Sequence, residues 1–249
     1  MKTVTVSWFS AGVSSAVATK LLINEIDHIL YQHIDDQEAD TLRFVADCEK
    51  WFGKKIAIQQ SPVKCVEAVC RSVGFVSSPS GAPCTGILKK SLRHAWEAEH
   101  TFFNRFRYIW GLDATPRERL RAEHIKKNMI EAEHVFPLID AGLTKPEIHG
   151  ILHKAGIRRP RMYDLGYQNN NCVGCVKGGK GYWNKIRMDF PSVFASRVKM
   201  ERDLEATCIK GVYLDSLDPS AGRNEPPISE ECGAMCESAD LLGPQEKRP

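Results

Sequence analysis

The chain has 249 residues, of which 43% are hydrophobic and 26% are charged, proportions that indicate a globular protein and exclude a disordered or fibrous chain. Its net charge of +3 is too small to indicate nucleic-acid binding by itself. No apolar run approaches the roughly 20 residues that cross a bilayer, and the first residues do not form a signal peptide, so we expect a cytoplasmic protein without a membrane partner.

Strand and helix patterns alternate through the first half of the chain. Apolar and polar residues alternate over residues 3–9, which predicts a strand, and apolar residues recur at helical spacing over 14–23. The predicted elements then follow in this order: strand 28–34, helix 40–53, strand 55–59, helix 63–73, helix 85–100, strand 107–112 and helix 116–129. This alternation predicts an α/β fold with a parallel sheet that helices cover on both faces.

The pattern changes after residue 142. A predicted helix over 146–155 precedes a basic connector, a glycine-rich loop with two cysteines, a long helix interrupted at Pro191, and an acidic tail that contains prolines. We therefore expect an α/β domain over 1–142, a helical and irregular region with the cysteine loop over 143–214, and the tail over 215–249. Residues 154–187 hold eight basic residues and one acidic residue, a balance that favours contact with an anion.

The first predicted strand leads directly into a run of small residues. This run consists of Ser10, Ala11, Gly12, Val13, Ser14 and Ser15. Small side chains at this point let backbone N–H groups approach a phosphate, and the N-terminus of the following helix adds partial positive charge. The run predicts an anion-binding loop, although a tight turn with serine caps has the same composition. Asp35 and Arg117 follow the ends of other predicted strands, where ligands of parallel sheets bind, although Arg117 also fits a solvated helix with internal ion pairs.

The nine cysteines are an odd number, and without an export signal they favour metal ligation or nucleophilic chemistry over disulfides. Cys172 and Cys175 form a C-x-x-C pair in the glycine-rich loop and can place two thiolates on one metal ion or cluster. Cys84 immediately precedes a predicted helix, whose dipole favours a thiolate, and is the expected third ligand. Cys232 or Cys236 can supply a fourth, or Cys232 can be a nucleophile. Thiolate sets accept zinc or an iron–sulfur cluster, and both remain open.

Other polar residues have simpler explanations. Lys177 is the exception, because the adjacent thiolate centre gives its charge an anion to organise. His149 and His153 are one turn apart on a predicted helix, and we expect them on a solvated face. Buried packing is expected for the remaining cysteines of the folded part, which are Cys48, Cys65, Cys70 and Cys208.

Several motifs together resemble known proteins. The Ser10–Ser15 run resembles the Ser-Gly-Gly-x-Asp-Ser loop of the PP-loop superfamily of adenine-nucleotide-binding proteins, with Ala11 in place of a glycine and Ser14 in place of the aspartate. Further segments resemble, in the same order, motifs of the phosphoadenylylsulfate (PAPS) reductase family. They are Ile34-Asp35-Asp36 with Asp40-Thr41, Pro83-Cys84-Thr85-Gly86, Trp110-Gly111-Leu112-Asp113 with Arg117, Tyr163 to Tyr167 followed by Cys172 and Cys175, and Glu231-Cys232-Gly233. The resemblance covers residues 4–233 and is greatest to phage-type members.

The resemblance implies a PP-loop fold in which residues 1–142 bind an adenine nucleotide, namely ATP, adenylylsulfate (APS) or PAPS. The Ser10–Ser15 run would hold its phosphates, Asp35 would lie near its ribose or adenine, and Gly111 and Arg117 would complete the site. The resemblance favours a 4Fe-4S cluster on Cys84, Cys172 and Cys175. Cys232, assisted by Lys177, would attack the sulfur and release sulfite, and a thioredoxin-like thiol would regenerate the enzyme.

Two other functions remain open. In the first, the protein is an ATP pyrophosphatase that adenylates an acceptor, such as a nucleobase of RNA or DNA, for transfer of sulfur or nitrogen. In the second, it is a zinc-stabilised nucleic-acid-binding protein without turnover, a reading motivated by Ser14 in place of the loop aspartate. The sequence also leaves a homo-oligomer open.

Overall fold

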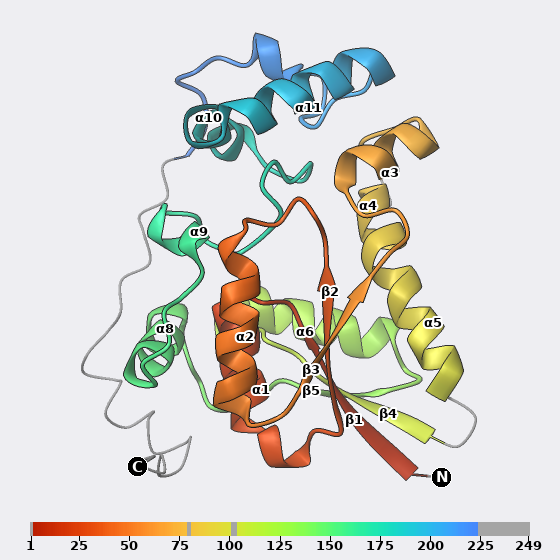
Figure 1. Cartoon of the computed structure of the whole chain (residues 1–249), viewed down its shortest axis with the longest axis vertical. Helices are drawn as coiled ribbons and strands as arrows, with labels where there is room; N and C mark the ends of the chain where they lie inside the picture. The colour runs from red at the N-terminus through yellow and green to blue at the C-terminus, as the bar shows by residue number, and fades with distance from the viewer. Residues whose placement is uncertain (1, 79–80, 101–103, 224–249) are drawn as a thin grey trace.

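The computed structural model describes residues 2–78, 81–100 and 104–223, and the structural statements below concern these residues. Five parallel strands form one sheet in the order β3-β2-β1-β4-β5 (Figure 1). The strands are β1 (Lys2–Phe9), β2 (His28–His33), β3 (Ile56–Gln60), β4 (Asn104–Ile109) and β5 (Glu133–Val135). The predicted α/β fold with a parallel sheet is confirmed, and the order reverses at β1, where ligand crevices form in such sheets.

The central strand β1 is buried on both faces. Val4 and Val6 pack in the apolar cluster on one face, whereas Thr5 and Ser7 are buried on the other. The Ser7 Oγ lies 2.7 Å from Thr19 Oγ1, so the buried Ser7 hydroxyl is satisfied by a hydrogen bond with the first helix. The alternation of β1 therefore reflects two packed faces rather than one solvated face.

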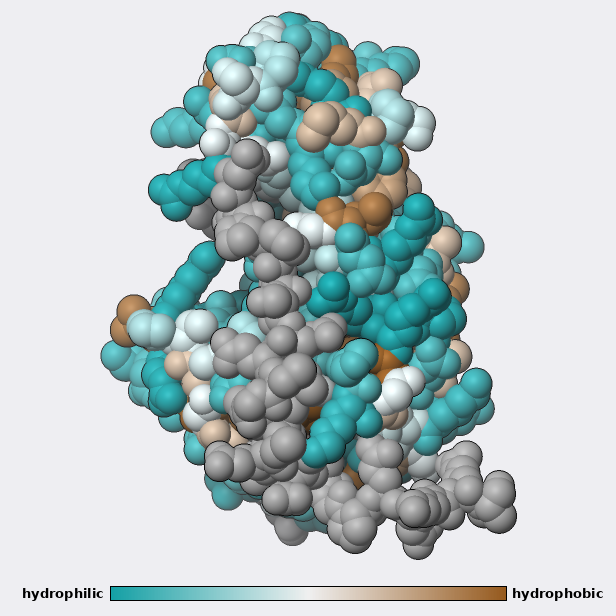
Figure 2. Space-filling model, turned by 90° about the vertical axis from the view of Figure 1, so that its left-hand side faces the viewer, coloured by the Kyte–Doolittle hydropathy of each residue, from teal (hydrophilic) through white to brown (hydrophobic). Residues whose placement is uncertain are grey.

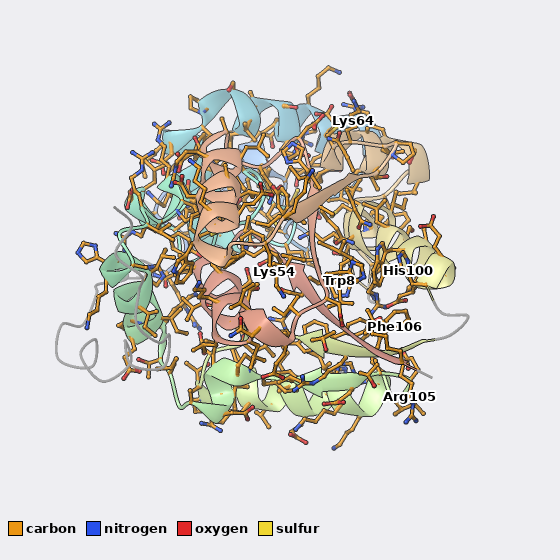
Figure 3. All side chains as sticks on the ribbon, turned by 60° about the horizontal axis from the view of Figure 1, so that its bottom comes forward. Trp8, Lys54, Lys64, His100, Arg105 and Phe106 are labelled. Atoms are coloured by element: carbon orange, nitrogen blue, oxygen red, sulfur yellow. The ribbon has the colours of Figure 1, made fainter. Side chains whose placement is uncertain are left out.

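Helices cover both faces of this sheet. The helices of the first half are α1 (Val13–Leu21), α2 (Asp40–Phe52), α3 (Val66–Val73), α4 (Pro83–Thr85), α5 (Ser91–His100) and α6 (Pro116–Asn128). A π-helical segment, Gly86–Lys90, joins α4 to α5. Helix α2 ends as predicted at Gly53, whose φ of 66° is left-handed. On the α5 face, Trp8, His100 and Phe106 gather around Trp96 (Figure 3).

The second half of the chain contributes to two different cores. Its helices are α7 (Pro137–Asp140), α8 (Lys145–Lys154), α9 (Arg161–Asp164), α10 (Lys180–Asp189) and α11 (Pro191–Leu204), followed by a 3-10 turn at Leu214–Ser216. In the first half, another 3-10 turn at Ile23–Glu25 follows α1. Helix α8 packs on α1 through Ile148, Ile151 and Leu152. Helices α10 and α11 pack with α3 and with Ile34 at the end of β2. The division of the chain at residue 142 stays a prediction.

Three details differ from the expectations. Strand β4 ends at Ile109 rather than at 112, because Trp110 leaves the strand after its N–H donates to the Val135 carbonyl of β5 at 3.0 Å. The short elements β5, α7 and α9 had no pattern long enough to predict them. The interruption of the long helix at Pro191 is confirmed, but it yields two separate helices, α10 and α11, that are divided at Phe190, with Pro191 as the first residue of α11.

The surface is mainly hydrophilic on the face shown in Figure 2, where apolar residues form small separate patches. Among the described residues, no helix is both long and apolar enough to cross a bilayer.

Candidate functional site

The Ser10–Ser15 run forms the turn between β1 and α1. Ala11 has a left-handed φ of 57°, and its carbonyl accepts a hydrogen bond from Asn170 Nδ2 at 2.8 Å. The Ser15 Oγ donates to the Gly12 carbonyl at 2.9 Å, and the Ser10 Oγ donates to the Ser15 Oγ at 3.0 Å. These contacts fix the turn at the carboxyl end of the central strand. Phosphate binding by this loop stays a prediction.

Gly111 joins the loop after β4 to the loop after β1. A Cβ atom at Gly111 would lie 2.6 Å from both the N and the Cα of Ser15, far inside van der Waals contact. Only glycine allows this approach, because the atoms that a Cβ would meet belong to the backbone and cannot move away by a rotamer change. The predicted loop residues Gly111 and Ser15 are thus brought together at the point where the strand order reverses.

A cleft of about 760 Å³ is lined by residues of α4, the cysteine loop and α10, and we call it the thiol cleft. All three predicted ligands, Cys84, Cys172 and Cys175, line it, together with Lys177 and Arg117. The other described lining residues are Ile34, Val66, Thr85, Lys89, Met162, Gly166 to Asn169, Asn171, Val176, Gly178 to Tyr182, Lys185, Gly222 and Arg223. The structure therefore assembles cysteines from α4 and from the loop before α10 on one cavity.

The thiol cleft is strongly cationic. Six basic residues line it, namely Lys89, Arg117, Lys177, Lys180, Lys185 and Arg223, and none of its described lining residues is Asp or Glu. Lys185 pairs with Asp189 at 2.8 Å, whereas the other five make no ion pair within the described part of the chain. Unpaired cations around a concave surface favour an anionic ligand.

The thiols of the cleft are partly removed from water. Burial raises the pKa of the Cys84 thiol, as does the nearby Cys175, while Lys177 and Lys89 oppose the rise. Burial also raises the pKa of Cys172 to about 12. Burial thus opposes the effect of the helix dipole on the Cys84 thiol, and thiolate ligation by Cys84 stays a prediction.

Tyr182, which the sequence pattern did not single out, holds the cysteine loop. Its hydroxyl accepts a hydrogen bond from the Cys175 N–H at 2.8 Å and donates one to the Cys172 carbonyl at 3.0 Å. Gly178 lies against the Tyr182 ring so closely that a Cβ would be 2.0 Å from Cδ1. Helix α10 thus fixes the spacing of the C-x-x-C pair.

Three thiols on one cavity suit a soft metal ion or an iron–sulfur cluster by donor type. Within residues 2–78, 81–100 and 104–223, however, no three His, Cys, Asp or Glu side chains are grouped as a single ion requires. A thiolate-bound centre on Cys84, Cys172 and Cys175 stays a prediction. Cys232 and Cys236 lie outside the described residues.

Asp35 does not line the thiol cleft. It lines a second cleft of about 480 Å³, whose other members include Glu38, Cys65 and Arg197. Its carboxylate accepts a hydrogen bond from Gln60 Nε2 at 2.6 Å. The Ser10–Ser15 run is not among the lining residues of the thiol cleft either, but Asn170 binds Ala11 while its neighbours Asn169 and Asn171 line that cleft.

The basic stretch 154–187 serves two purposes. Its first arginines form ion pairs within the fold, as in the contacts of Arg158 with Asp40 at 3.1 Å and of Arg159 with Asp164 at 2.7 Å. Of the eight basic residues in this stretch, only Lys177, Lys180 and Lys185 line the thiol cleft. A count of charges along the sequence therefore overstates the anion-facing surface.

The expectation of a solvated His149 is also wrong. The side chain is only 2% exposed, and its ring packs edge-on against Tyr163 with centroids 4.8 Å apart. Burial lowers the pKa of His149 to about 4. The Tyr163 hydroxyl in turn accepts a hydrogen bond from the Val13 N–H at 3.3 Å, which links α8 to the loop after β1.

Two glycines fix the chain at the rim of the thiol cleft. A Cβ at Gly222 would lie 2.1 Å from the Gly181 N, and a Cβ at Gly181 would lie 2.6 Å from the Arg223 carbonyl oxygen. The backbone at 222–223 thus packs directly on the first turn of α10. The predicted nucleophile Cys232 follows further along the chain, outside the described residues.

Comparison with known proteins adds no family assignment, since the chain matches no protein-family model and a search of curated proteins finds no similar one.

Proposed function

We propose that the protein is an adenine-nucleotide-binding enzyme that reduces a sulfonucleotide, APS or PAPS, to sulfite with protein thiols. The observation that carries the proposal is the thiol cleft, which combines three cysteines with six cations and no described carboxylate. A sulfonucleotide is anionic at both its phosphate and its sulfate, and its reduction needs thiols close to the sulfur. The cleft supplies cations for these anions, and its cysteines lie where the further thiol of Cys232 would have to act.

The nucleotide would extend from the loop after β1 into the thiol cleft. Backbone N–H groups of the Ser10–Ser15 run and the N-terminus of α1 would hold its phosphate end. Asn170 connects this loop to the wall of the cleft, and Arg117 approaches from the first turn of α6. A volume of about 760 Å³ suffices for a ligand of nucleotide size.

In the proposed reaction, the Cys232 thiolate attacks the sulfur of the bound sulfonucleotide. The bond between this sulfur and the bridging phosphate oxygen breaks, and AMP leaves from APS, or its 3′-phosphorylated form from PAPS. Cys232 is then an S-sulfocysteine. A second thiol, from Cys236 or a thioredoxin-like protein, attacks the Sγ of Cys232, which forms a disulfide and releases sulfite. The thiols lose the two electrons that the sulfur gains. Lys177 would neutralise the sulfonate oxygens.

A zinc ion or a 4Fe-4S cluster, if bound by Cys84, Cys172 and Cys175, would keep these three thiols deprotonated and fix the cysteine loop at the thiol cleft. The steps above need only the thiols of the protein and its reductant. Reduced thiols of this kind belong to a reducing compartment, so we place the protein in the cytoplasm.

The test uses the full-length protein under anaerobic conditions with APS or PAPS and thioredoxin. We expect sulfite and the free nucleotide in equal amounts. Cys232→Ser should bind the nucleotide but form no sulfite, whereas the matched variant Cys65→Ser, whose thiol lines the other cleft, should keep its activity. Full activity of Cys232→Ser would refute the proposed nucleophile.

The same cleft also suits the second candidate, because cysteines beside a nucleotide site could carry sulfur to an acceptor. With ATP as substrate, release of AMP and pyrophosphate together with an absence of sulfite formation would favour this transferase. Salt-dependent binding of RNA or DNA without turnover of any nucleotide would instead favour the binding protein.

A further inference from the structure

Arg197 of α11 is a buried cation that contacts three separate segments. Its side chain is 4% exposed. The Nη2 group pairs with the Asp36 carboxylate, Nη1 lies 3.4 Å from the Glu67 carboxylate, and Nε donates to the Gly174 carbonyl at 3.3 Å. The planar guanidinium thus fixes the end of β2, α3 and the cysteine loop relative to one another.

Asp36 completes the connection to the cysteine loop. Its backbone carbonyl accepts a hydrogen bond from the Val173 N–H at 2.7 Å, and its carboxylate accepts one from the Val66 N–H at 2.6 Å. Val173 and Gly174 are the two residues between Cys172 and Cys175. Val173 is therefore bound by Asp36 directly, and Gly174 is bound by Arg197, which pairs with Asp36.

The backbone at Gly174 has little freedom of its own. Its φ of 71° is left-handed, and a Cβ at this position would lie 2.7 Å from a methyl carbon of Val193. Val193 and Arg197 are one turn apart on α11, so this helix both crowds the loop and binds its carbonyl. The position of Cys175 therefore depends on where α11 holds Gly174.

We infer that Asp36 and Arg197 are positioning residues that set the place of Cys175 in the thiol cleft. The inference deepens the proposed function, because it concerns the geometry of the same cleft. A purely stabilising ion pair would protect all cysteines of the cleft alike. A positioning pair changes Cys175, which follows Gly174, more than Cys84, which lies on α4 and not on the cysteine loop.

The two cleft cysteines therefore provide an internal comparison. In the full-length protein as purified, the rates at which N-ethylmaleimide labels Cys175 and Cys84 are measured by peptide mass spectrometry, and their ratio is taken. Asp36→Asn keeps an oxygen for the Val66 N–H but removes the charge that holds Arg197. Arg197→Lys keeps the charge but cannot reach all three partners. We expect each variant to raise the ratio about tenfold, as loss of one charge-assisted hydrogen bond permits.

Glu67→Gln is the matched control. It removes a carboxylate from the same guanidinium, but the hydrogen bonds and ion pairs of Glu67 go to Arg71, Ser196 and Arg197 rather than to the cysteine loop. We expect the labelling ratio of this variant to stay within about twofold of the parent ratio. Such a change is smaller than the effect of losing one neutral hydrogen bond. If Arg197→Lys does not fold, Asp36→Asn carries the test alone.

An unchanged ratio in a folded Asp36→Asn protein, or an equal change in Glu67→Gln, would overturn the inference. Labelling requires no turnover, so failure of sulfite formation would refute the proposed function while leaving this result intact. Where sulfite does form, the positioning role predicts a lower kcat with little change in KM, since the nucleotide loop after β1 is not altered.

Discussion

Gly111→Ala tests the contact on which the proposed nucleotide site depends. The added Cβ would lie 2.6 Å from two backbone atoms of Ser15 and 2.9 Å from the Ser14 carbonyl carbon. Relief to an ordinary carbon contact requires a shift of about 1 Å, either of the loop after β4 or of the first turn of α1. Overpacking of this kind costs about 1 to 3 kcal/mol of unfolding free energy.

The shift also bears on ligand binding, because the first turn of α1 carries the N–H groups that would meet the phosphates. We expect nucleotide affinity, measured by calorimetry with ATP and APS, to fall by about a factor of ten or more. Urea unfolding gives the stability in parallel. Gly86→Ala is the control, since a Cβ there meets no atom within 4 Å and an alanine in a helical segment adds up to about 1 kcal/mol.

The two measurements refute different steps of the reasoning. A Gly111→Ala protein as stable as the parent would show that the contact between the loops is not close. A destabilised but folded variant with unchanged affinity would show that the nucleotide does not depend on the first turn of α1.

Three further changes have defined outcomes. Gly12→Asp should abolish nucleotide binding by placing a negative charge beside the phosphates, whereas Gly12→Ala should retain it, because its Cβ makes ordinary contacts with the Tyr163 hydroxyl at 3.4 Å and the Ser10 Oγ at 3.6 Å; equal affinities of the two variants in calorimetry would contradict the loop assignment. Tyr182→Phe should lower the unfolding free energy by about 2 kcal/mol, because a part-buried N–H and a carbonyl of the cysteine loop lose their partner. In the same urea titration, the control Tyr213→Phe should lower the unfolding free energy by less than about 0.5 kcal/mol. His149 has a folded pKa of about 4, so only the unfolded chain gains its proton as the pH falls from 6.5 to 4; stability should drop by up to about 3 kcal/mol over this window, and a His149→Leu protein with the same pH slope as the parent would refute the assignment.

The regular elements of the sheet were predictable because their patterns are local. The residues of β1 alternate and are followed by small residues and a helical stripe, and Gly53 marks the end of α2. The end of β4 was not predictable, because Trp110, Gly111 and Leu112 continue the apolar run although the chain turns across the end of β1. In β5 only three residues pair with β4, too few for a period of two to be recognised.

The candidate site shows the same division. The position of Cys84 before a helix and the C-x-x-C spacing of Cys172 and Cys175 suggested a shared site, and all three line the thiol cleft. Their role as metal ligands stays a prediction. The supporting contacts join residues far apart in sequence, such as Asn170 with Ala11 and Arg197 with Asp36, and no local pattern encodes them. For His149, helical spacing could not tell which face of α8 packs on α1.

The contact between Gly181 and Gly222 has a consequence for the kinetics of the tail. Cys232 is nine residues beyond Arg223, and nine residues span at most about 30 Å in any conformation. Within a sphere of that radius around the rim of the thiol cleft, one thiol has a local concentration on the order of 10 mM. In the proposed reaction, attack by Cys232 is therefore independent of dilution, whereas release of sulfite by an external thiol follows the concentration of that thiol.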